Sequence, residues 1–456
     1  MRRDPARSGC FVGEGNTATP LLALGIHSHY VDRRQQGIFL RGYEMGNRGK
    51  NTAYEWKIVI LLAILFGIVG LDRLVIVYLF PVLMPELNLN NAQAGAIASV
   101  LALTWAISTW VLGSLSDKFG RKPILIASAV FFSLMTSFTG VAKTFAGMLA
   151  VRGLLGIGEG GVFSASAAKI DEISSPQKRG LNLGIHQSFF PLLGIGLGPI
   201  IATQLVLHMH WEWVFFVLGI PGLILAFLLA KGMRRTEISG SLPTRSTDGG
   251  SASAVLKYKN IWLTTIIASL FQTGLFVFST FVALYLTKVV GLPLDTSGLI
   301  ISGWGFGGFL GMIAVPALSD HLGRRPLLVI AAACYGALML LFVLVQAGPT
   351  IKFLNLFAAG FFGFGIAPLF LAVIPCESVP PHLTGSAVGV PTGVSELIGG
   401  VIMPVVAGGL ADRFGLTYPM LIVGVVSLVC AVVGLLLTET SPHVLTSLKR
   451  SSIEVA

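Results

Sequence analysis

Asp117-Lys-Phe-Gly-Arg-Lys-Pro123 returns 203 residues later as Asp320-His-Leu-Gly-Arg-Arg-Pro326. Five more matches follow at an offset of 205 residues, where Glu172, Pro176, Gly180, Gly184 and Pro199 return as Glu377, Pro381, Gly385, Gly389 and Pro404. Matches at so constant an offset are hard to obtain by chance. They predict a chain made of two similar halves.

The composition around this repeat is that of a membrane protein. Of the 456 residues, 54% are hydrophobic and 11% are charged, and the mean hydropathy is +0.81. A soluble domain carries about 25% charged residues, and an apolar run of about 20 residues spans a bilayer as a helix. The sequence predicts an all-α polytopic protein with 12 transmembrane helices in two pseudo-symmetric six-helix bundles, at about 57–84, 93–114, 124–142, 145–168, 181–206, 213–231, 261–287, 296–316, 326–347, 351–375, 386–411 and 418–437.

The polar stretches divide the chain into five parts. We expect a disordered cytoplasmic tail over 1–54, a first bundle over 55–231, a flexible linker over 232–259, a second bundle over 260–440 and a cytoplasmic tail over 441–456. Met45 is an alternative start of translation. An internal repeat of this kind is typical of secondary transporters, whose substrate site lies between the halves near the middle of the bilayer.

The basic residues are distributed unevenly about the predicted helices. Of 31 Lys and Arg residues, 25 fall in the tails, the linker and the loops on one side, four fall on the other side, and two lie inside predicted spans. The positive-inside rule therefore predicts cytoplasmic termini. The net charge of +10 then reflects membrane orientation, and we expect no nucleic-acid partner.

The sequence offers little for catalysis or for a bound cofactor. Four cysteines show no paired or metal-ligand spacing, and His208 and His210 lie in a predicted outer loop. No nucleotide-binding loop, metal cluster or serine-hydrolase elbow is visible. We expect neither an enzyme nor a metal or cofactor, other than a proton as coupling ion.

Asp72 and Arg73 stand side by side inside the first predicted span. A charge near the middle of a bilayer is costly, so such residues are functional candidates by default. In the fourth span, Arg152 and Glu159 are seven residues apart and share one helix face. They are separated by roughly 10 Å along the axis, so each needs another partner, for which Asp72 and Arg73 are the obvious candidates.

The loop after the second span resembles a known signature. Gly113-Ser-Leu-Ser-Asp-Lys-Phe-Gly-Arg-Lys122 is similar to the cytoplasmic loop motif of the major facilitator superfamily, and the second copy strengthens the resemblance. We expect the loop either to bias the carrier between inward-open and outward-open states or merely to fix its topology. The candidate gating residues are Gly113, Asp117, Gly120, Arg121, Lys122, Asp320, Gly323, Arg324 and Arg325.

Within that superfamily, three stretches resemble the anion:cation symporter family, the group of sialin and bacterial sugar-acid carriers. They are Asp72-Arg73, the segment 152–161, and the segment 184–199 followed by Trp211-Glu-Trp213. The family usually has Trp-Arg-Trp there, so Glu212 is a departure. The seventh span also lacks the Arg that some relatives use for a second carboxylate, which argues against a dicarboxylate.

The resemblance implies roles for the buried charges. Arg73 is expected to meet the substrate anion, Glu159 to be the main proton-coupling acid and Asp72 a second one. Arg152 is a candidate substrate ligand, with helix packing as an equal alternative. In the second half, Gln272 and Ser395 are candidate ligands, either for substrate or in ordinary interhelical hydrogen bonds.

Three other polar residues have open roles. Glu396 is an intramembrane acid whose role the sequence leaves open, Asn355 is a further polar residue of the second half, and His186 is expected near the cytoplasmic end in contact with solvent. At the 203-residue offset, Asp72 maps to Leu275 and Glu159 to Phe362, so the charge machinery is one-sided.

These features favour proton-coupled uptake of a small organic anion, such as a sugar acid or an aromatic carboxylate, by alternating access. We expect a monomer in the lipid bilayer of a bacterial inner membrane. The alternative is proton-antiporting efflux of a drug or metabolite, since Gly194-x-x-x-Gly198-Pro199 is half of an antiporter pattern.

Overall fold

The computed structural model describes residues 52–175, 178–234, 252–380, 383–442 and 444. The predictions for the N-terminal tail, for most of the linker and for most of the C-terminal tail lie outside the described residues. Within the described part, 12 helices are long and apolar enough to cross a membrane. The predicted fold class is therefore confirmed.

Helices α2 to α8 make the first half. They are α2 (Thr52–Glu86), α3 (Asn91–Phe119), α4 (Arg121–Thr139), α5 (Phe145–Ile173), α6 (Arg179–Phe189) continued by η1 (Phe190–Leu197) and α7 (Gly198–His208), and α8 (Trp211–Gly232). The second half repeats this order with α10 (Lys259–Leu284) and η2 (Tyr285–Val289), α11 (Leu294–Leu322), α12 (Arg324–Leu344), α13 (Pro349–Pro368) with η3 (Leu369–Val373) and α14 (Ile374–Glu377), α15 (Thr384–Ser395) with η5 (Glu396–Ile402) and α16 (Met403–Phe414), and α17 (Thr417–Gly434). A short helix, α9 (Ala252–Val255), precedes the second half.

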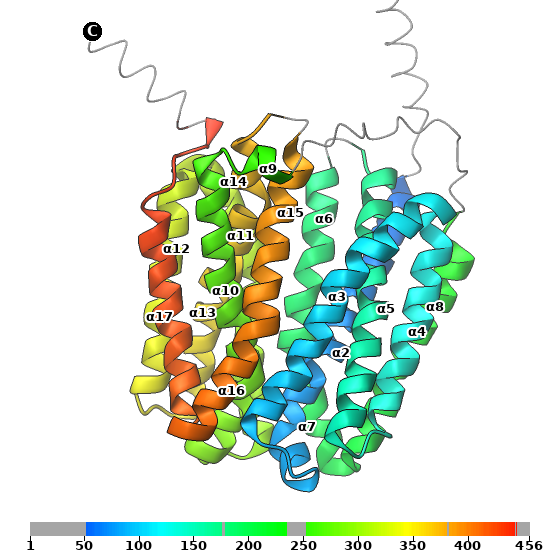
Figure 1. Ribbon diagram of the computed structural model, residues 1–456, viewed down its shortest axis with the longest axis vertical. Helices are drawn as coiled ribbons and strands as arrows, with labels where there is room; N and C mark the ends of the chain where they lie inside the picture. The colour runs from blue at the N-terminus through cyan, green and yellow to red at the C-terminus, as the bar shows by residue number, and fades with distance from the viewer. Residues whose placement is uncertain (1–51, 176–177, 235–251, 381–382, 443, 445–456) are drawn as a thin grey trace, which may run out of the picture. The chain divides into compact units, whose positions relative to one another are not determined.

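Figure 1 shows α3, α4, α5 and α8 together on one side and α12, α13 and α17 on the other. The first and seventh spans, α2 and α10, contact each other and are the most deeply buried of the 12. The core of the molecule therefore lies where the two halves meet.

In the part of the chain that the structure describes, four spans contain π-helical turns, at η1, η2, η3 and η5. A π-turn adds a residue to the helical repeat and changes which side chains face a neighbour, and such turns are frequent at functional sites. Glu396 is the first residue of η5. The π-turns were not predicted from the sequence.

Both copies of the repeated loop lie at one end of the bundle, which we call the motif end and which is uppermost in Figure 1. Each copy turns at a glycine with positive φ, +92° at Gly120 and +101° at Gly323, a conformation that side chains disfavour. Arg121 pairs with Asp117, and Arg324 pairs with Asp320 at 2.5 Å and with Glu377 at 3.0 Å. These ion pairs stay within their own half.

The second copy is anchored further by Glu439, which follows the last span. Its carboxylate accepts hydrogen bonds from the backbone N–H groups of Arg324 and Arg325, at 2.9 and 3.1 Å, at the start of α12. Partial burial raises the pKa of Glu439, but the hydrogen bonds from the Ser441, Arg324, Arg325 and Thr440 backbone outweigh it, so the pKa is lowered.

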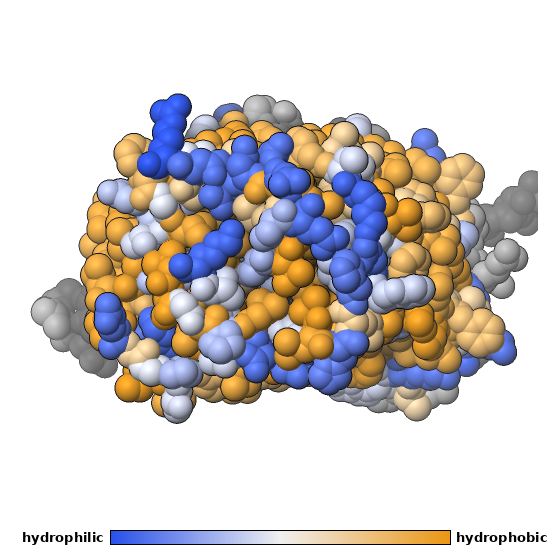
Figure 2. Space-filling model, turned by 90° about the horizontal axis from the view of Figure 1, so that it is seen from below, coloured by the Kyte–Doolittle hydropathy of each residue, from blue (hydrophilic) through white to orange (hydrophobic). Residues whose placement is uncertain are grey.

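At the opposite end, which we call the closed end, the halves meet closely. A Cβ atom on Gly95 of α3 would lie 2.2 Å from the Pro404 carbonyl oxygen of α16. Asp412 of α16 accepts hydrogen bonds from the N–H groups of Asn91 and Ala92, each at 3.0 Å, at the first turn of α3. Figure 2 views this end, where hydrophilic residues lie across the face with hydrophobic residues around them.

Candidate functional site

Arg73 lies at the contact between the two halves. Its Nη2 donates a 2.5 Å hydrogen bond to Oε1 of Glu396, and both side chains are buried. The guanidinium also lies over two aromatic rings, Trp105 of the first half at 5.3 Å and Phe276 of the second at 4.8 Å. Aromatic faces attract a cation, so the two rings favour a positive charge between them.

Glu396 is held by both halves. Its second oxygen, Oε2, accepts a hydrogen bond from Nε2 of Gln272 at 2.9 Å. The carboxylate therefore has a cationic donor on α2 and an amide donor on α10. The sequence left the role of Glu396 open, and the structure shows that its partner is Arg73.

Arg152 is engaged with the backbone of the first span. Its Nη1 and Nη2 donate to the carbonyl oxygens of Asp72 and Arg73, at 3.0 and 2.6 Å. Asp72 and Arg73 are the partner residues expected for Arg152, and the contacts are with their main-chain oxygens. Only Nε lacks a hydrogen-bond partner among the described residues, and this geometry favours the packing alternative over substrate binding.

Asp72 and Glu159 are both buried in the first half. Oδ2 of Asp72 accepts a hydrogen bond from the Thr136 hydroxyl at 2.9 Å. Both carboxyl oxygens of Glu159 lack a hydrogen-bond partner within the described part of the chain, although the group lies near enough to Arg73, Arg152 and Glu396 to interact electrostatically. An ionised carboxylate is costly to bury unpaired, so Glu159 is suited to bind and release a proton as its surroundings change.

The other predicted polar residues lie apart from these contacts. Ser395 is buried and donates to the Thr392 carbonyl of its own helix at 3.0 Å, and Oδ1 of Asn355 has no partner among the described residues. His186 is fully buried, stacked on Phe66 and hydrogen-bonded to Ser166 at 2.9 Å. The prediction that solvent surrounds His186 was wrong, since the residue faces the helix packing of the first half.

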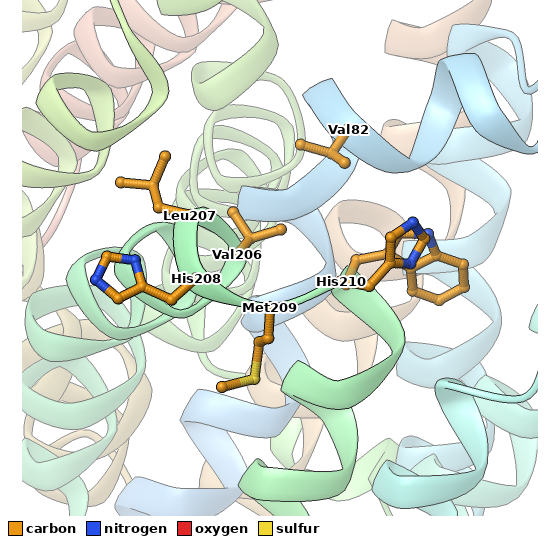
Figure 3. A pocket seen from close by; sticks show the side chains of 7 residues that line it. Val82, Val206, Leu207, His208, Met209 and His210 are labelled. Atoms are coloured by element: carbon orange, nitrogen blue, oxygen red, sulfur yellow. The ribbon is translucent and has the colours of Figure 1, made fainter.

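A second polar cluster occupies the closed end. Glu86, His210 and Glu212 present possible metal-ligating atoms within 4.8 Å of one another, beside a pocket of about 360 Å³ lined by Val82 and residues 206–211. Figure 3 shows His208 and His210 on opposite sides of the junction between α7 and α8. Lys143 pairs with Glu212, and the Trp211 indole donates to Glu86 at 2.7 Å. We interpret the cluster as an ion-pair network, and the expected lack of a metal stays a prediction.

Several residues of the central site were not predicted from the sequence. Trp105, Thr136 and Phe276 carry no signal beyond an aromatic or hydroxyl group in an apolar span. Glu86 lies far from His210 and Glu212 in the sequence, so the spacing around His210 gave no sign of it.

Comparisons with known proteins agree with this architecture. The profile of the Major Facilitator Superfamily matches residues 62–397. A probable 4-methylmuconolactone transporter of Cupriavidus pinatubonensis is 28% identical over 377 residues, which cover 79% of this chain and 85% of the relative. A cis,cis-muconate transport protein of Acinetobacter baylyi is 25% identical over 411 residues, covering 88% and 98%.

Among solved structures, a bacterial homologue of the lysosomal transporter Spinster has a TM-score of 0.69 at 19% identity, covering 84% of this chain and 96% of that one. At this identity the likeness concerns the fold alone. The profile match spans well over half of the sequence. The chain therefore belongs to the Major Facilitator Superfamily, whose members are membrane transporters and not enzymes.

Proposed function

We propose that this protein carries small organic anions into the cell together with protons. The observation that carries the proposal is the buried Arg73, which lies between two aromatic rings where the halves meet and beside the unpartnered carboxyl of Glu159. A guanidinium presents a planar pair of donors that suits a carboxylate. The relatives named above, a muconolactone carrier and a muconate carrier, support this class of substrate.

The chemistry of the site favours a monovalent anion. Arg152, the other buried arginine of the site, donates from two nitrogens to backbone oxygens, whereas Arg73 pairs with a side chain, that of Glu396. Arg73 is therefore the arginine better suited to exchange its partner for a ligand. The flat walls of Trp105 and Phe276 suit an aromatic or sugar ring. The muconate relative handles a dicarboxylate by name, so muconate is a discriminating member of any substrate panel.

Glu159 is the coupling acid in this proposal, with Asp72 as a second one. Proton binding at Glu159 offsets the negative charge that the substrate brings into a buried site. We place the protein in a bacterial inner membrane with the motif end on the cytoplasmic side, because most Lys and Arg residues flank that end. The carrier acts as a monomer in this proposal.

The test is uptake by proteoliposomes that contain the purified protein. Labelled glucuronate, benzoate and cis,cis-muconate are offered with an inward proton gradient, and a protonophore serves as control. We expect accumulation of at least one monocarboxylate that the protonophore abolishes. Anion-stimulated efflux against an opposite proton gradient, without uptake, would replace this proposal with the antiport alternative.

A further inference from the structure

The carboxylate of Glu396 is bound as a ligand's carboxylate would be. One oxygen meets Nη2 of Arg73 at 2.5 Å and the other meets Nε2 of Gln272 at 2.9 Å. The two donors come from different halves of the molecule, on α2 and α10. The group is nearly enclosed, with 5% of its side chain exposed.

We propose that Glu396 is an internal competitor of the substrate, holding Arg73 in the empty carrier at the place that the substrate carboxylate takes when it binds. This inference rests on the proposed function, because it requires Arg73 to be the group that meets the anion. In this role, Glu396 sets both the affinity for the substrate and the balance between net uptake and exchange.

A purely structural role for this ion pair is at odds with its position. Arg73 belongs to the first half and Glu396 to the second, and carriers of this fold work by rocking one half against the other. A pair that bridges the halves at the core must be rearranged when they move apart. Glu396 also begins the π-helical segment η5, whose irregular backbone is suited to a small shift of the side chain.

The Arg73–Glu396 pair also neutralises the buried charge of Arg73 when the carrier is empty. An unpaired guanidinium buried between the halves is strongly destabilised, and the rings of Trp105 and Phe276 cannot replace a counter-ion. Glu396 supplies that counter-ion when substrate is absent. Among the described residues, Glu159 of α5 in the first half also interacts electrostatically with both Arg73 and Glu396.

The competitor can be removed with little change in shape by Glu396→Gln. We expect affinity for glucuronate or benzoate to rise by about tenfold or more, since the substrate no longer displaces a charged hydrogen-bond partner. Exchange of internal for external substrate should persist. Net uptake should fall several-fold, because the empty carrier then has an unpaired Arg73.

The measurements are binding to purified protein by calorimetry and, separately, counterflow and net uptake in proteoliposomes. Glu86→Gln is the matched control, because it makes the same change at the exposed closed end and should leave affinity unchanged. If Glu396→Gln fails to give monodisperse protein, Glu396→Ala replaces it with the same expectation.

An affinity in Glu396→Gln that is equal to or weaker than that of the wild type overturns the proposal, as does a parallel loss of exchange and net uptake. Wild-type protein that neither binds nor carries any of the anions would instead refute the proposed function itself. The two failures are thus distinguished by the behaviour of the wild type.

Discussion

The two halves of the molecule share one fold but not one chemistry. The first half buries Asp72, Arg73, Arg152 and Glu159, whereas the second half contributes Glu396 and the neutral Gln272 to the same contact. The residues that occupy the repeat-related positions of Asp72 and Glu159 are apolar, Leu275 and Phe362. The helices were therefore retained in both halves, while most of the buried charges of the central site lie in the first half.

This difference assigns separate tasks to the halves. The charges of the first half interact mainly with one another, through Arg152 and the backbone of Asp72 and Arg73. Of these four residues, Arg73 forms an ion pair with the other half, through Glu396. The Arg73–Glu396 ion pair thus couples the two halves, and substitutions on either side of it should have different consequences.

The largest effect is expected for Glu159→Gln in the charged half. The amide keeps the size of the side chain but cannot bind and release a proton, so gradient-driven accumulation should fall to the level of empty liposomes. Exchange of substrate, which needs no net proton movement, should survive. The measurement is uptake and counterflow of the same labelled anion, with Glu86→Gln as control. Full accumulation by Glu159→Gln would remove this residue from proton coupling.

Arg73→Lys tests the group that crosses between the halves. An ammonium cannot present the planar fork of a guanidinium, so we expect the dissociation constant for benzoate or glucuronate to rise by about tenfold or more. Calorimetry on purified protein measures it. Arg413→Lys, the same exchange at an exposed position of the closed end, should bind as the wild type does. An unchanged affinity in Arg73→Lys would make Arg73 structural and would weaken the inference about Glu396.

The fold could be predicted from the sequence far better than the site. Long apolar runs predict the 12 helices, since a membrane-spanning helix depends mainly on local composition. The constant repeat offset predicts the two halves, since it can be read from the sequence without knowing any contact. The partner of Arg73 is 323 residues away, where no spacing rule applies. The π-turn that begins at Glu396 changes which side chains of that span face Arg73, so a regular helical wheel does not predict the contact.

The partners of Arg152 show a second limit. Helical periodicity placed Arg152 and Glu159 on one face, but it cannot show that a guanidinium will choose main-chain oxygens over a carboxylate. That choice depends on how closely α5 approaches α2, which is a property of packing. The same holds for His186, whose burial against Phe66 follows from the position of α6 beside α2.

Arg152→Gln is expected to affect stability within the charged half more than substrate recognition. It removes charged donors from two buried carbonyl oxygens, which should lower the free energy of unfolding by about 2–4 kcal/mol. Thermal unfolding in detergent measures the loss, and calorimetry measures affinity in the protein that remains folded. Weak binding with unchanged thermal stability would restore Arg152 to the list of substrate ligands.

The smallest effect is expected at Asp412, where the halves meet away from the charges. Asp412-Arg-Phe-Gly415 has the form of Asp117-Lys-Phe-Gly120, and both glycines have positive φ, +93° and +92°. Asp117 is 63% exposed and pairs within its own half, whereas Asp412 caps the first turn of α3 across the interface. Similar loops at opposite ends are thus engaged differently in this state.

Asp412→Asn should loosen the closed end by about 1 kcal/mol, the size of a helix-capping and dipole interaction. Spin labels on the exposed residues Asn88 and Phe414, one in each half, report the separation there. We expect a longer and broader distance distribution in Asp412→Asn, and no change in Arg413→Lys. Because the contacts of Asp412 are with Asn91 and Ala92 and not with the central site, substrate affinity should change little. A closed end that stays unchanged in Asp412→Asn would mean that close helix packing, as at Gly95 and Pro404, holds the halves together without this carboxylate.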